Sequence, residues 1–266
     1  MHTKNSLIAD LKTAGINPSG TLMIHSSCKS VGVVEGRGDT ILDAFIDFMR
    51  DGLLIFPTHT WEYVMNEGFD ENGAPVGKNN IFDYETMPSC VGILPNLFLK
   101  RPGVIRSMHP THSVAAIGTK AAEFTDGEEF TQSPCPRNGC HGKLYDRGAQ
   151  ILFLGCELTK NTYLHGVEEW YNVPGRLTEK PQEIFIRRGG ELIPCPQYRH
   201  HFSGGNVSDN YDKAEKLFIE NGAATYCKIG DAHSVLCDAV KMADLIGEIL
   251  KNEPDYFASG KLKSPS

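Results

Sequence analysis

The segment from residue 21 to residue 57 constrains the fold most, because it has the order strand, loop, helix, strand. Short apolar runs at Thr21–His25 and Leu53–Pro57 predict two strands, and the amphipathic stretch Asp39–Met49 between them predicts a helix. Two strands joined by a helix are normally parallel neighbours in one sheet, with a right-handed crossover. The sequence therefore predicts an α/β protein with a mixed, largely parallel sheet covered by helices.

Further helices and strands follow along the chain. The patterns predict helices at Ser6–Ala14, Val91–Lys100, Ala121–Phe124, around His165, at Asn210–Glu220 and at Val235–Lys251, and strands at Ser113–Ile117, Ile151–Leu154 and Thr225–Ile229. Glu183–Ile193 predicts a hairpin that turns at Gly189 and Gly190. The long irregular segment 58–89 is expected to cover a ligand, and a second irregular segment is expected at 133–142. We expect a core over residues 1–175 and a smaller mixed α+β lobe over residues 176–266.

Length and composition indicate a globular protein with a substantial core. The chain has 266 residues, of which 40% are hydrophobic and 22% charged. No run approaches the roughly 20 apolar residues of a membrane helix, and the N-terminus lacks the apolar core of a secretion signal. We therefore expect a cytoplasmic protein with no membrane partner. The formal net charge of -7 argues against a nucleic-acid partner.

The eight cysteines are dispersed and are expected to stay reduced. Cys135, Cys140 and His141 come closest to the spacing of a zinc site. A structural zinc site has four ligands, and no fourth ligand is close in sequence. The sequence therefore predicts no metal.

His165 and Glu168 are the most informative pair of polar residues. They lie three positions apart in a predicted helix, so they share one face of it. A carboxylate beside an imidazole holds the ring in one tautomer and favours its protonated form, which makes a usable general base near neutral pH. The same spacing also occurs in structural His–Glu pairs, so the pair by itself leaves both interpretations open.

Two other segments have the composition of binding loops. Ser26–Gly32 follows the first strand with small side chains, Gly and Lys29, which is typical of an anion cradle, although an ordinary strand-to-helix connection looks similar. It matches neither the dinucleotide fingerprint nor the Walker pattern. Arg106–Ser113 combines two imidazoles, hydroxyls and a proline, which makes a binding site and a purely structural role about equally well supported.

The order of these motifs resembles that of a known family. The chain carries His25–Ser27 with Gly32, Phe56–His59, Pro88–Ser89 with Gly92, Arg106–Ser113, Gly142–Leu144, Leu154–Gly155 and Asn161–Glu168. In this order they resemble the motifs of the antibiotic (aminoglycoside 3-N-) acetyltransferase family. The resemblance extends from Leu7 to about Leu250. The resemblance implies an acyl-CoA-dependent N-acyltransferase with a three-layer α/β/α core, a smaller mixed lobe and no metal.

The resemblance also implies roles for individual residues. It makes His165 the general base, oriented by Glu168. It places the loop of Ser27, Cys28, Lys29, Ser30, Val31 and Gly32 near the pantetheine and phosphates of acyl-CoA, and it places His109, Thr111, His112 and Ser113 along the thioester. Such a reaction needs a base for the amine and hydrogen-bond donors for the oxyanion, which backbone amides or Ser113 could supply.

The expected acceptor side departs from the family pattern. We expect acceptor contacts from Thr58, His59, Asp83, Tyr84, Asn96, Arg199, His200 and His201. Aminoglycoside-modifying members carry carboxylates where this chain has Pro95, Asn96 and the segment Pro194–Phe202, and carboxylates suit a polycationic drug. Their replacement favours a nucleotide-linked amino sugar, with Arg199, His200 or His201 near a diphosphate.

Several alternatives remain open at the level of sequence. The acceptor could instead be an aminoglycoside, or the protein could bind CoA or a nucleotide without catalysis. A ping-pong route through Cys28 or Cys90 is chemically conceivable, but neither thiol has a basic partner nearby in sequence. Water or the leaving thiolate could replace His165 as the base. The oligomeric state, a homo-oligomer included, is also left open.

Overall fold

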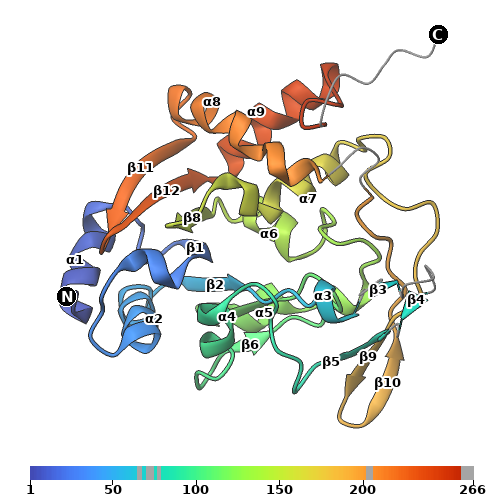
Figure 1. Ribbon diagram of the computed structural model, residues 1–266, viewed down its shortest axis with the longest axis horizontal. Coiled ribbons are helices and arrows are strands. Elements are labelled where there is room, and N and C mark those ends of the chain that lie inside the picture. Colours follow the sequence, from blue (N-terminus) through green and yellow to red (C-terminus); the bar gives the residue numbers. More distant parts are fainter. Residues whose placement is uncertain (65–67, 70–74, 77–78, 202–205, 259–266) are drawn as a thin grey trace.

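The computed structural model describes residues 1–64, 68–69, 75–76, 79–201 and 206–258. A seven-stranded sheet with the order β11-β12-β8-β1-β2-β7-β6 forms its centre (Figure 1). The central strands β1 (Thr21–Ser26), β2 (Leu53–Pro57) and β8 (Gln150–Leu154) run parallel to one another. Helix α2 (Arg37–Phe48) connects β1 to β2 as the sequence predicts.

Antiparallel strands extend this parallel centre on both sides. On the β2 side are β7 (Val114–Gly118) and β6 (Ile105–Arg106), and on the β8 side are β12 (Ala232–Asp238) and β11 (Ala224–Ile229). The predicted mixed sheet is therefore confirmed, with parallel pairing confined to its three central strands.

Helices cover both faces of the large sheet. One face carries α1 (Lys4–Thr13), α2 and α4 (Ile93–Phe98), and the other carries α5 (Ala121–Thr125), α6 (Cys140–Asp146), α7 (Thr162–Trp170), α8 (Glu215–Glu220) and α9 (Ala239–Asn252). Side chains alternate along β8: Leu152 and Leu154 pack into the first core, and Ile151 and Phe153 into the second. This arrangement is the predicted three-layer α/β/α core.

Short helices complete the described chain. They are α3 (Trp61–Val64) and the 3₁₀ helices η1 (Cys28–Val31), η2 (Glu128–Phe130), η3 (Leu158–Lys160) and η4 (Val207–Ala214). None of the helices in the described ranges is long and apolar enough to cross a membrane.

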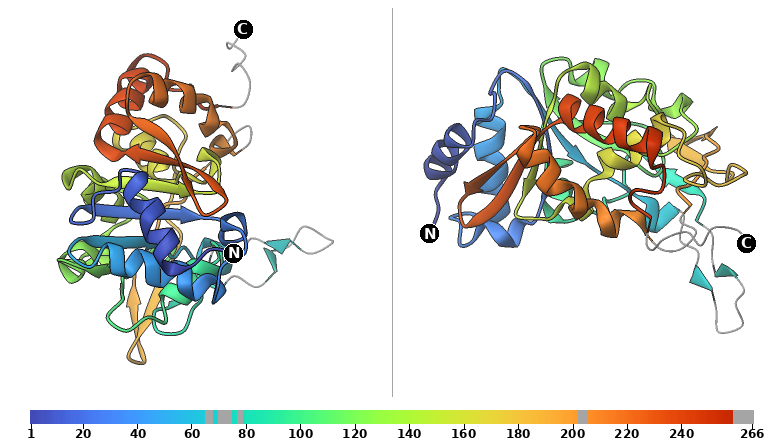
Figure 2. Two further views of the ribbon diagram at one scale, coloured as in Figure 1. Left: turned by 90° about the vertical axis from the view of Figure 1, so that its left-hand side faces the viewer. Right: turned by 90° about the horizontal axis from the view of Figure 1, so that it is seen from above.

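A second, three-stranded sheet lies at the opposite end of the molecule from α1 (Figure 2). It contains β5 (Ile81–Asp83), β9 (Phe185–Arg188) and β10 (Glu191–Pro194), and β9 and β10 form the predicted hairpin. Its own small core includes Phe82 and Ile186. Strands β3 (Gly68–Phe69) and β4 (Pro75–Val76) pair with each other. Residues 65–67, 70–74 and 77–78 of the long irregular segment lie outside the described residues.

The two sheets do not divide the chain at residue 175. Strand β5 comes from the N-terminal part and pairs with β9, whereas β11 and β12 come from the C-terminal part and extend the large sheet. The helix predicted over Val235–Lys251 is a strand until Asp238. Val235 and Cys237 pack into one core and Leu236 into the other, which is the alternation of a strand. Residues 140–142, expected to end an irregular segment, instead begin α6.

Asp238 marks the turn from β12 into α9, and its carboxylate accepts hydrogen bonds from the backbone N–H groups of Val240 and Lys241. We expect Asp238→Ala to lower the free energy of unfolding by about 1 kcal/mol, because two helix donors lose their cap. Urea denaturation measures this change. Asp238→Asn keeps the cap and should stay close to the parent protein; equal losses in both variants would contradict the capping role.

Candidate active site

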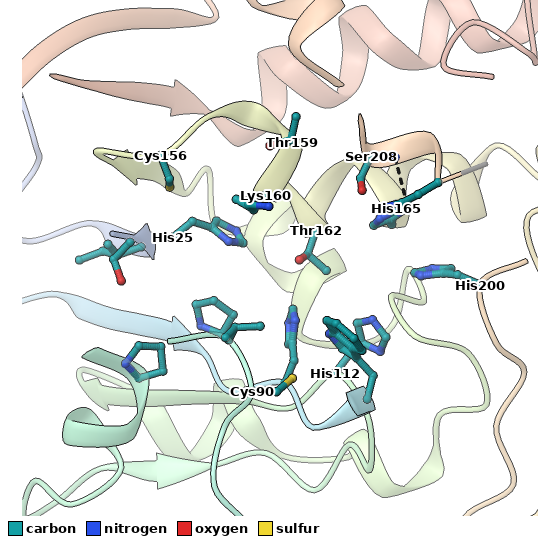
Figure 3. Close-up of a pocket in the computed structure, with 18 of the residues that line it drawn as sticks. His25, Cys90, His112, Cys156, Thr159, Lys160, Thr162, His165, His200 and Ser208 are labelled. Carbon is teal, nitrogen blue, oxygen red and sulfur yellow. Dashed lines mark hydrogen bonds between the residues drawn. The ribbon is translucent and has the colours of Figure 1, made fainter. Parts of the chain in front are cut away.

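A cavity of about 710 Å³ opens at the carboxyl ends of the three parallel strands. His25 lies at the end of β1 and Cys156 follows β8 (Figure 3). Ser26 is the last residue of β1, and His59 follows β2. Parallel strands present their carboxyl ends at one edge of a sheet, where ligands of α/β proteins usually bind. The fold therefore gathers loops from distant parts of the sequence around one space.

Four further segments complete the wall of the cavity. The lining residues are Ile24, His25, Ser26, Ser27, Pro57, His59, Trp61, Cys90, Val91, Pro95, His112, Cys156, Thr159, Lys160, Thr162, His165, Arg199, His200, Asn206 and Ser208. His165 and Thr162 come from α7, and His112 and Cys90 approach from the opposite side (Figure 3). Of the predicted site residues, Ser27, His59, His112, His165, Arg199 and His200 line this space.

The loop after β1 is locked against the end of β8. Ser30 Oγ lies 2.8 Å from Ser27 Oγ and donates to the Gly155 carbonyl at 3.0 Å. Gly155 has φ of 61°, and a Cβ there would lie 2.4 Å from Ser30 Cβ, so glycine is required at this approach. Val31 is buried in the core. Only Ser27 of the predicted CoA loop lines the cavity, and the predicted CoA contacts of Cys28, Lys29, Ser30, Val31 and Gly32 stay predictions.

Behind the cavity wall, His165 connects to Glu168 through a third residue. Tyr211 Oη lies 2.6 Å from His165 Nδ1 and donates to Glu168 Oε2 at 2.7 Å. The direct distance from His165 Nδ1 to Glu168 Oε2 is 3.6 Å. Arg176 Nε donates to the other oxygen, Glu168 Oε1, at 2.7 Å. The predicted pair is therefore present as a connected set of four side chains.

The carboxylate of Glu168 is 1% exposed, so its charge depends on these partners. Burial by itself raises the pKa of Glu168, but the neighbouring His165 imidazole, the Arg176 guanidinium and the hydrogen bond from Tyr211 outweigh it and hold that pKa below its usual value. Burial and the adjacent carboxylate raise the pKa of Tyr211 well above its usual value. Glu168 is thus ionised and Tyr211 is a neutral hydroxyl.

A second imidazole–carboxylate pair lies beside the first. His200 Nε2 is 2.7 Å from Glu169 Oε1, and the His200 and His165 rings stack with centroids 4.5 Å apart. Glu169 also accepts hydrogen bonds from Ser133 Oγ at 2.6 Å and from the Cys135 backbone N–H at 2.9 Å. Consecutive carboxylates of α7 therefore hold two neighbouring histidines.

Within the described residues, Cys135, Glu169 and His200 form a group of three potential metal ligands. Their ligand atoms already have partners: Glu169 Oε1 lies 2.7 Å from His200 Nε2, and Cys135 Sγ donates to the Thr162 carbonyl. Cys140 and His141, the other members of the zinc candidate in the sequence, are not part of this group. All eight cysteines are free.

Buried histidines crowd the inner end of the cavity. The His59 ring centroid lies 4.9 Å from that of His112 and 6.1 Å from that of His141. Burial lowers the pKa of His25 and of His165 to about 4, and that of His141 to about 3. Burial, followed by repulsion from neighbouring histidines, lowers the pKa of His59 and His112 well below 6.5. These rings are neutral at pH 7.

The polar side chains of the segment 106–113 mainly form structural hydrogen bonds. His109 Nδ1 accepts the backbone N–H groups of Thr111 and His112, so its Nε2 carries the proton and donates to the Ser133 carbonyl at 2.9 Å. Ser113 Oγ donates to the Thr58 carbonyl at 2.8 Å and accepts from Arg106 Nε. Of His109, Thr111, His112 and Ser113, only His112 lines the cavity, so the suggested oxyanion role of Ser113 has no support in this geometry.

The predicted acceptor residues fall into two groups. His59, Arg199 and His200 line the cavity, whereas Thr58, Asp83, Tyr84, Asn96 and His201 do not. Asn96 bonds to the Ser89 backbone, Tyr84 Oη donates to the Arg106 carbonyl, and Asp83 pairs with Arg187 in the small sheet. His201 is exposed, and its backbone N–H donates to Arg176. The side chains of Asn96, Tyr84 and Asp83 therefore support the surrounding walls.

Several residues of the site were not found from the sequence. Tyr211 and Arg176 have no local motif, and only the folded chain brings them to Glu168. Thr162 lies within the Asn161–Glu168 motif and Lys160 directly precedes it, so this motif was the available signal for both. Cys90 was considered as a nucleophile but not as a lining residue.

Comparison with known proteins identifies the family. The family model described as aminoglycoside 3-N-acetyltransferase matches residues 23–251. The chain belongs to this family. The aminoglycoside N(3)-acetyltransferase III of Serratia marcescens is 29% identical over 268 residues, covering 90% of this chain and 93% of the relative.

Two further comparisons agree with this assignment. The SPbeta prophage-derived aminoglycoside N(3')-acetyltransferase-like protein YokD of Bacillus subtilis (strain 168) is 28% identical over 272 residues, covering 92% of this chain and 89% of the relative. A solved structure named "AAC-IIIb binary with CoASH" superposes with a TM-score of 0.81 at 24% identity, covering 100% of this chain and 99% of that chain. The predicted fold and the predicted class, a CoA-dependent N-acyltransferase, are thereby confirmed.

The buried histidines predict a pH dependence of stability. Below pH 6.5 the unfolded chain binds protons that the buried rings do not bind until near pH 4, so the free energy of unfolding falls as pH decreases through this window. Each such histidine adds a slope of about 1.4 kcal/mol per pH unit. We expect urea denaturation between pH 7 and pH 4.5 to show an uptake of more than one proton on unfolding.

The matched variants are His141→Gln, which removes one buried imidazole outside the cavity wall, and His233→Gln, which removes an exposed one. The slope of stability against pH should decrease in His141→Gln relative to His233→Gln. Equal slopes would show that burial of His141 does not set its proton binding.

Proposed function

We propose that this enzyme transfers the acetyl group of acetyl-CoA to an amine of an aminoglycoside, with His165 as the general base. The observation that carries the proposal is the position of His165 on the cavity wall with an ionised, buried carboxylate behind it, in a member of the aminoglycoside 3-N-acetyltransferase family. The structural neighbour solved with CoASH supports CoA as the co-substrate.

The bond changes follow from the chemistry of thioesters. The amine nitrogen attacks the thioester carbonyl carbon, the N–C bond forms and the C–S bond breaks, and the proton lost by nitrogen ends on the thiolate of CoA. In the tetrahedral adduct the nitrogen is positively charged and far more acidic than in the free amine. A neutral imidazole can therefore accept this proton, although burial lowers the pKa of His165 to about 4, below the near-neutral value that the sequence predicts.

Direct transfer is better supported than a cysteine-bound intermediate. Cys90 lines the cavity, but burial raises the pKa of its thiol, and burial also raises the pKa of Cys28. A nucleophilic cysteine needs a lowered pKa and a base within reach. We therefore expect both substrates to bind before any product leaves.

The acceptor is the less constrained half of the proposal. The sequence favoured a nucleotide-linked amino sugar, but the relatives reported above carry aminoglycoside acetyltransferase names, so an aminoglycoside is the better supported acceptor. One observation keeps a less cationic acceptor as the second candidate. Among the described lining residues, the charged side chains are Lys160 and Arg199, and none is Asp or Glu. These cations suit a phosphate group, whether on CoA or on the acceptor.

Free-thiol release from acetyl-CoA tests both candidates. We expect release with at least one of a panel of aminoglycosides such as gentamicin, and a loss of kcat/KM of about 100-fold or more in His165→Ala, because a positioned base contributes that much. His233→Ala, an exposed site outside the cavity, is the matched control. Release with phosphate-bearing amino sugars alone would replace the aminoglycoside by the second candidate, and full activity of His165→Ala would remove the base assignment.

Initial-rate kinetics test direct transfer. With both substrates varied, double-reciprocal plots should intersect, and mass spectrometry after incubation with acetyl-CoA alone should detect no acetylated Cys90, because its protonated thiol is a poor nucleophile. Parallel lines together with an acetylated cysteine peptide would establish the ping-pong route instead.

A further inference from the structure

We infer that Tyr211 is a positioning residue that fixes His165 in the tautomer with its proton on Nδ1, and so keeps Nε2 able to accept a proton. This inference rests on the proposed role of His165 as the base. It assigns a task to a residue that lies 46 positions from His165 in the chain.

The geometry places Tyr211 between the imidazole and the carboxylate. Its Oη lies 2.6 Å from His165 Nδ1 and 2.7 Å from Glu168 Oε2, both well within hydrogen-bond range. The direct separation of Nδ1 and Glu168 Oε2 is 3.6 Å, which is too long for a hydrogen bond. Orientation of the ring by Glu168 therefore passes through the Tyr211 hydroxyl.

Counting protons determines the tautomer. A tyrosine hydroxyl has a single proton, and an ionised carboxylate can only accept hydrogen bonds. Tyr211 therefore gives its proton to Glu168, and its oxygen must accept the proton of His165 Nδ1. A neutral imidazole has one N–H, so Nε2 carries the lone pair that a general base uses.

The other contacts of Glu168 and Tyr211 prevent a direct hydrogen bond between Glu168 and His165. Arg176 holds Glu168 Oε1, so the carboxylate cannot turn that oxygen toward the imidazole without losing an ion pair at 2.7 Å. Tyr211 itself is completely buried and packs edge-on against Phe257, with ring centroids 4.7 Å apart. The hydroxyl is therefore held at one point between its two partners.

The same contacts act during the reaction. When Nε2 takes the proton of the acylated amine, the ring becomes an imidazolium whose Nδ1–H still points at the Tyr211 oxygen. Tyr211 stays protonated and bonded to Glu168, so the negative charge of the carboxylate stabilises the new positive charge through the hydroxyl. The imidazolium then returns its proton from Nε2 to the leaving thiolate, which restores the starting tautomer.

Tyr211→Phe is the first test, because it removes the hydroxyl and keeps the ring. We expect kcat to fall by about 10- to 100-fold, as for other residues that orient a functional imidazole, while KM for acetyl-CoA changes little. In spectra of ¹⁵N-histidine-labelled protein at pH 7, His165 should change from Nδ1–H alone to a mixture of tautomers. Tyr163→Phe is the matched control, since Tyr163 is equally buried and its Oη donates to the Ala239 carbonyl.

Glu168→Gln provides a second and sharper test. Arg176 Nε is a donor and so retains the amide oxygen of glutamine, which turns the amide NH₂ group toward Tyr211. Tyr211 must then accept that proton and donate its own to His165 Nδ1. We expect His165 to appear as the Nε2–H tautomer, with a larger loss of kcat than in Tyr211→Phe.

The spectra of the wild-type protein are informative without any substrate. Detection of Nε2–H in the wild-type protein, or an unchanged tautomer in both variants, would overturn the role of Tyr211. If no acceptor amine is turned over while the tautomers behave as expected, the proposed function fails and the positioning role stands. Failure of Tyr211→Phe to fold would leave the wild-type protein and Glu168→Gln as the test.

Discussion

The buried carboxylate of Glu168 is the constraint on which the His165 wall of the cavity depends. A charge that is 1% exposed must be compensated by partners that arrive from other segments, here Arg176 after α7 and Tyr211 from η4. These contacts fix α7 relative to two segments that follow it in the chain. The position and protonation of His165 follow from this arrangement, because its Nδ1 meets the hydroxyl that Glu168 orients.

The opposite wall of the cavity depends on a buried cation. Arg106 donates to the carbonyls of Met87 and Thr58 and to Ser113, and its guanidinium lies 4.8 Å from the Phe82 ring centroid. Burial lowers its pKa to about 10, which still leaves it charged at pH 7. The motif 106–113 thus joins the large sheet to the small one. In the sequence, the polar residues of this segment resemble those of a binding segment. In the structure they are buried and need hydrogen-bond partners, and the backbone supplies most of these partners.

The sequence predicted the strands and the helix that surround the site well. It predicted the side chains that line the cavity less well. The apolar runs of β1, β2 and β8 are short and continuous, so their strands and the edge where they end could be found from pattern alone. The Asn161–Glu168 motif gave His165 and Glu168 because helical spacing is local. The sequence predicts acceptor contacts for Asp83 and Asn96, but packing gives them other partners, Arg187 and the Ser89 backbone. The identity of a polar residue does not by itself show which way its side chain points in the folded protein.

By itself, the sequence determined the α/β class, the family and the helix that carries His165, because these depend on periodicity and on motifs that are continuous in the chain. The tertiary structure decided the contacts between segments that are far apart in the chain. It placed β12 beside β8, paired His200 with Glu169, and inserted the Tyr211 hydroxyl between His165 and Glu168. Each of these contacts joins segments far apart in sequence. It can therefore form, and stabilise the protein, only after the chain has folded.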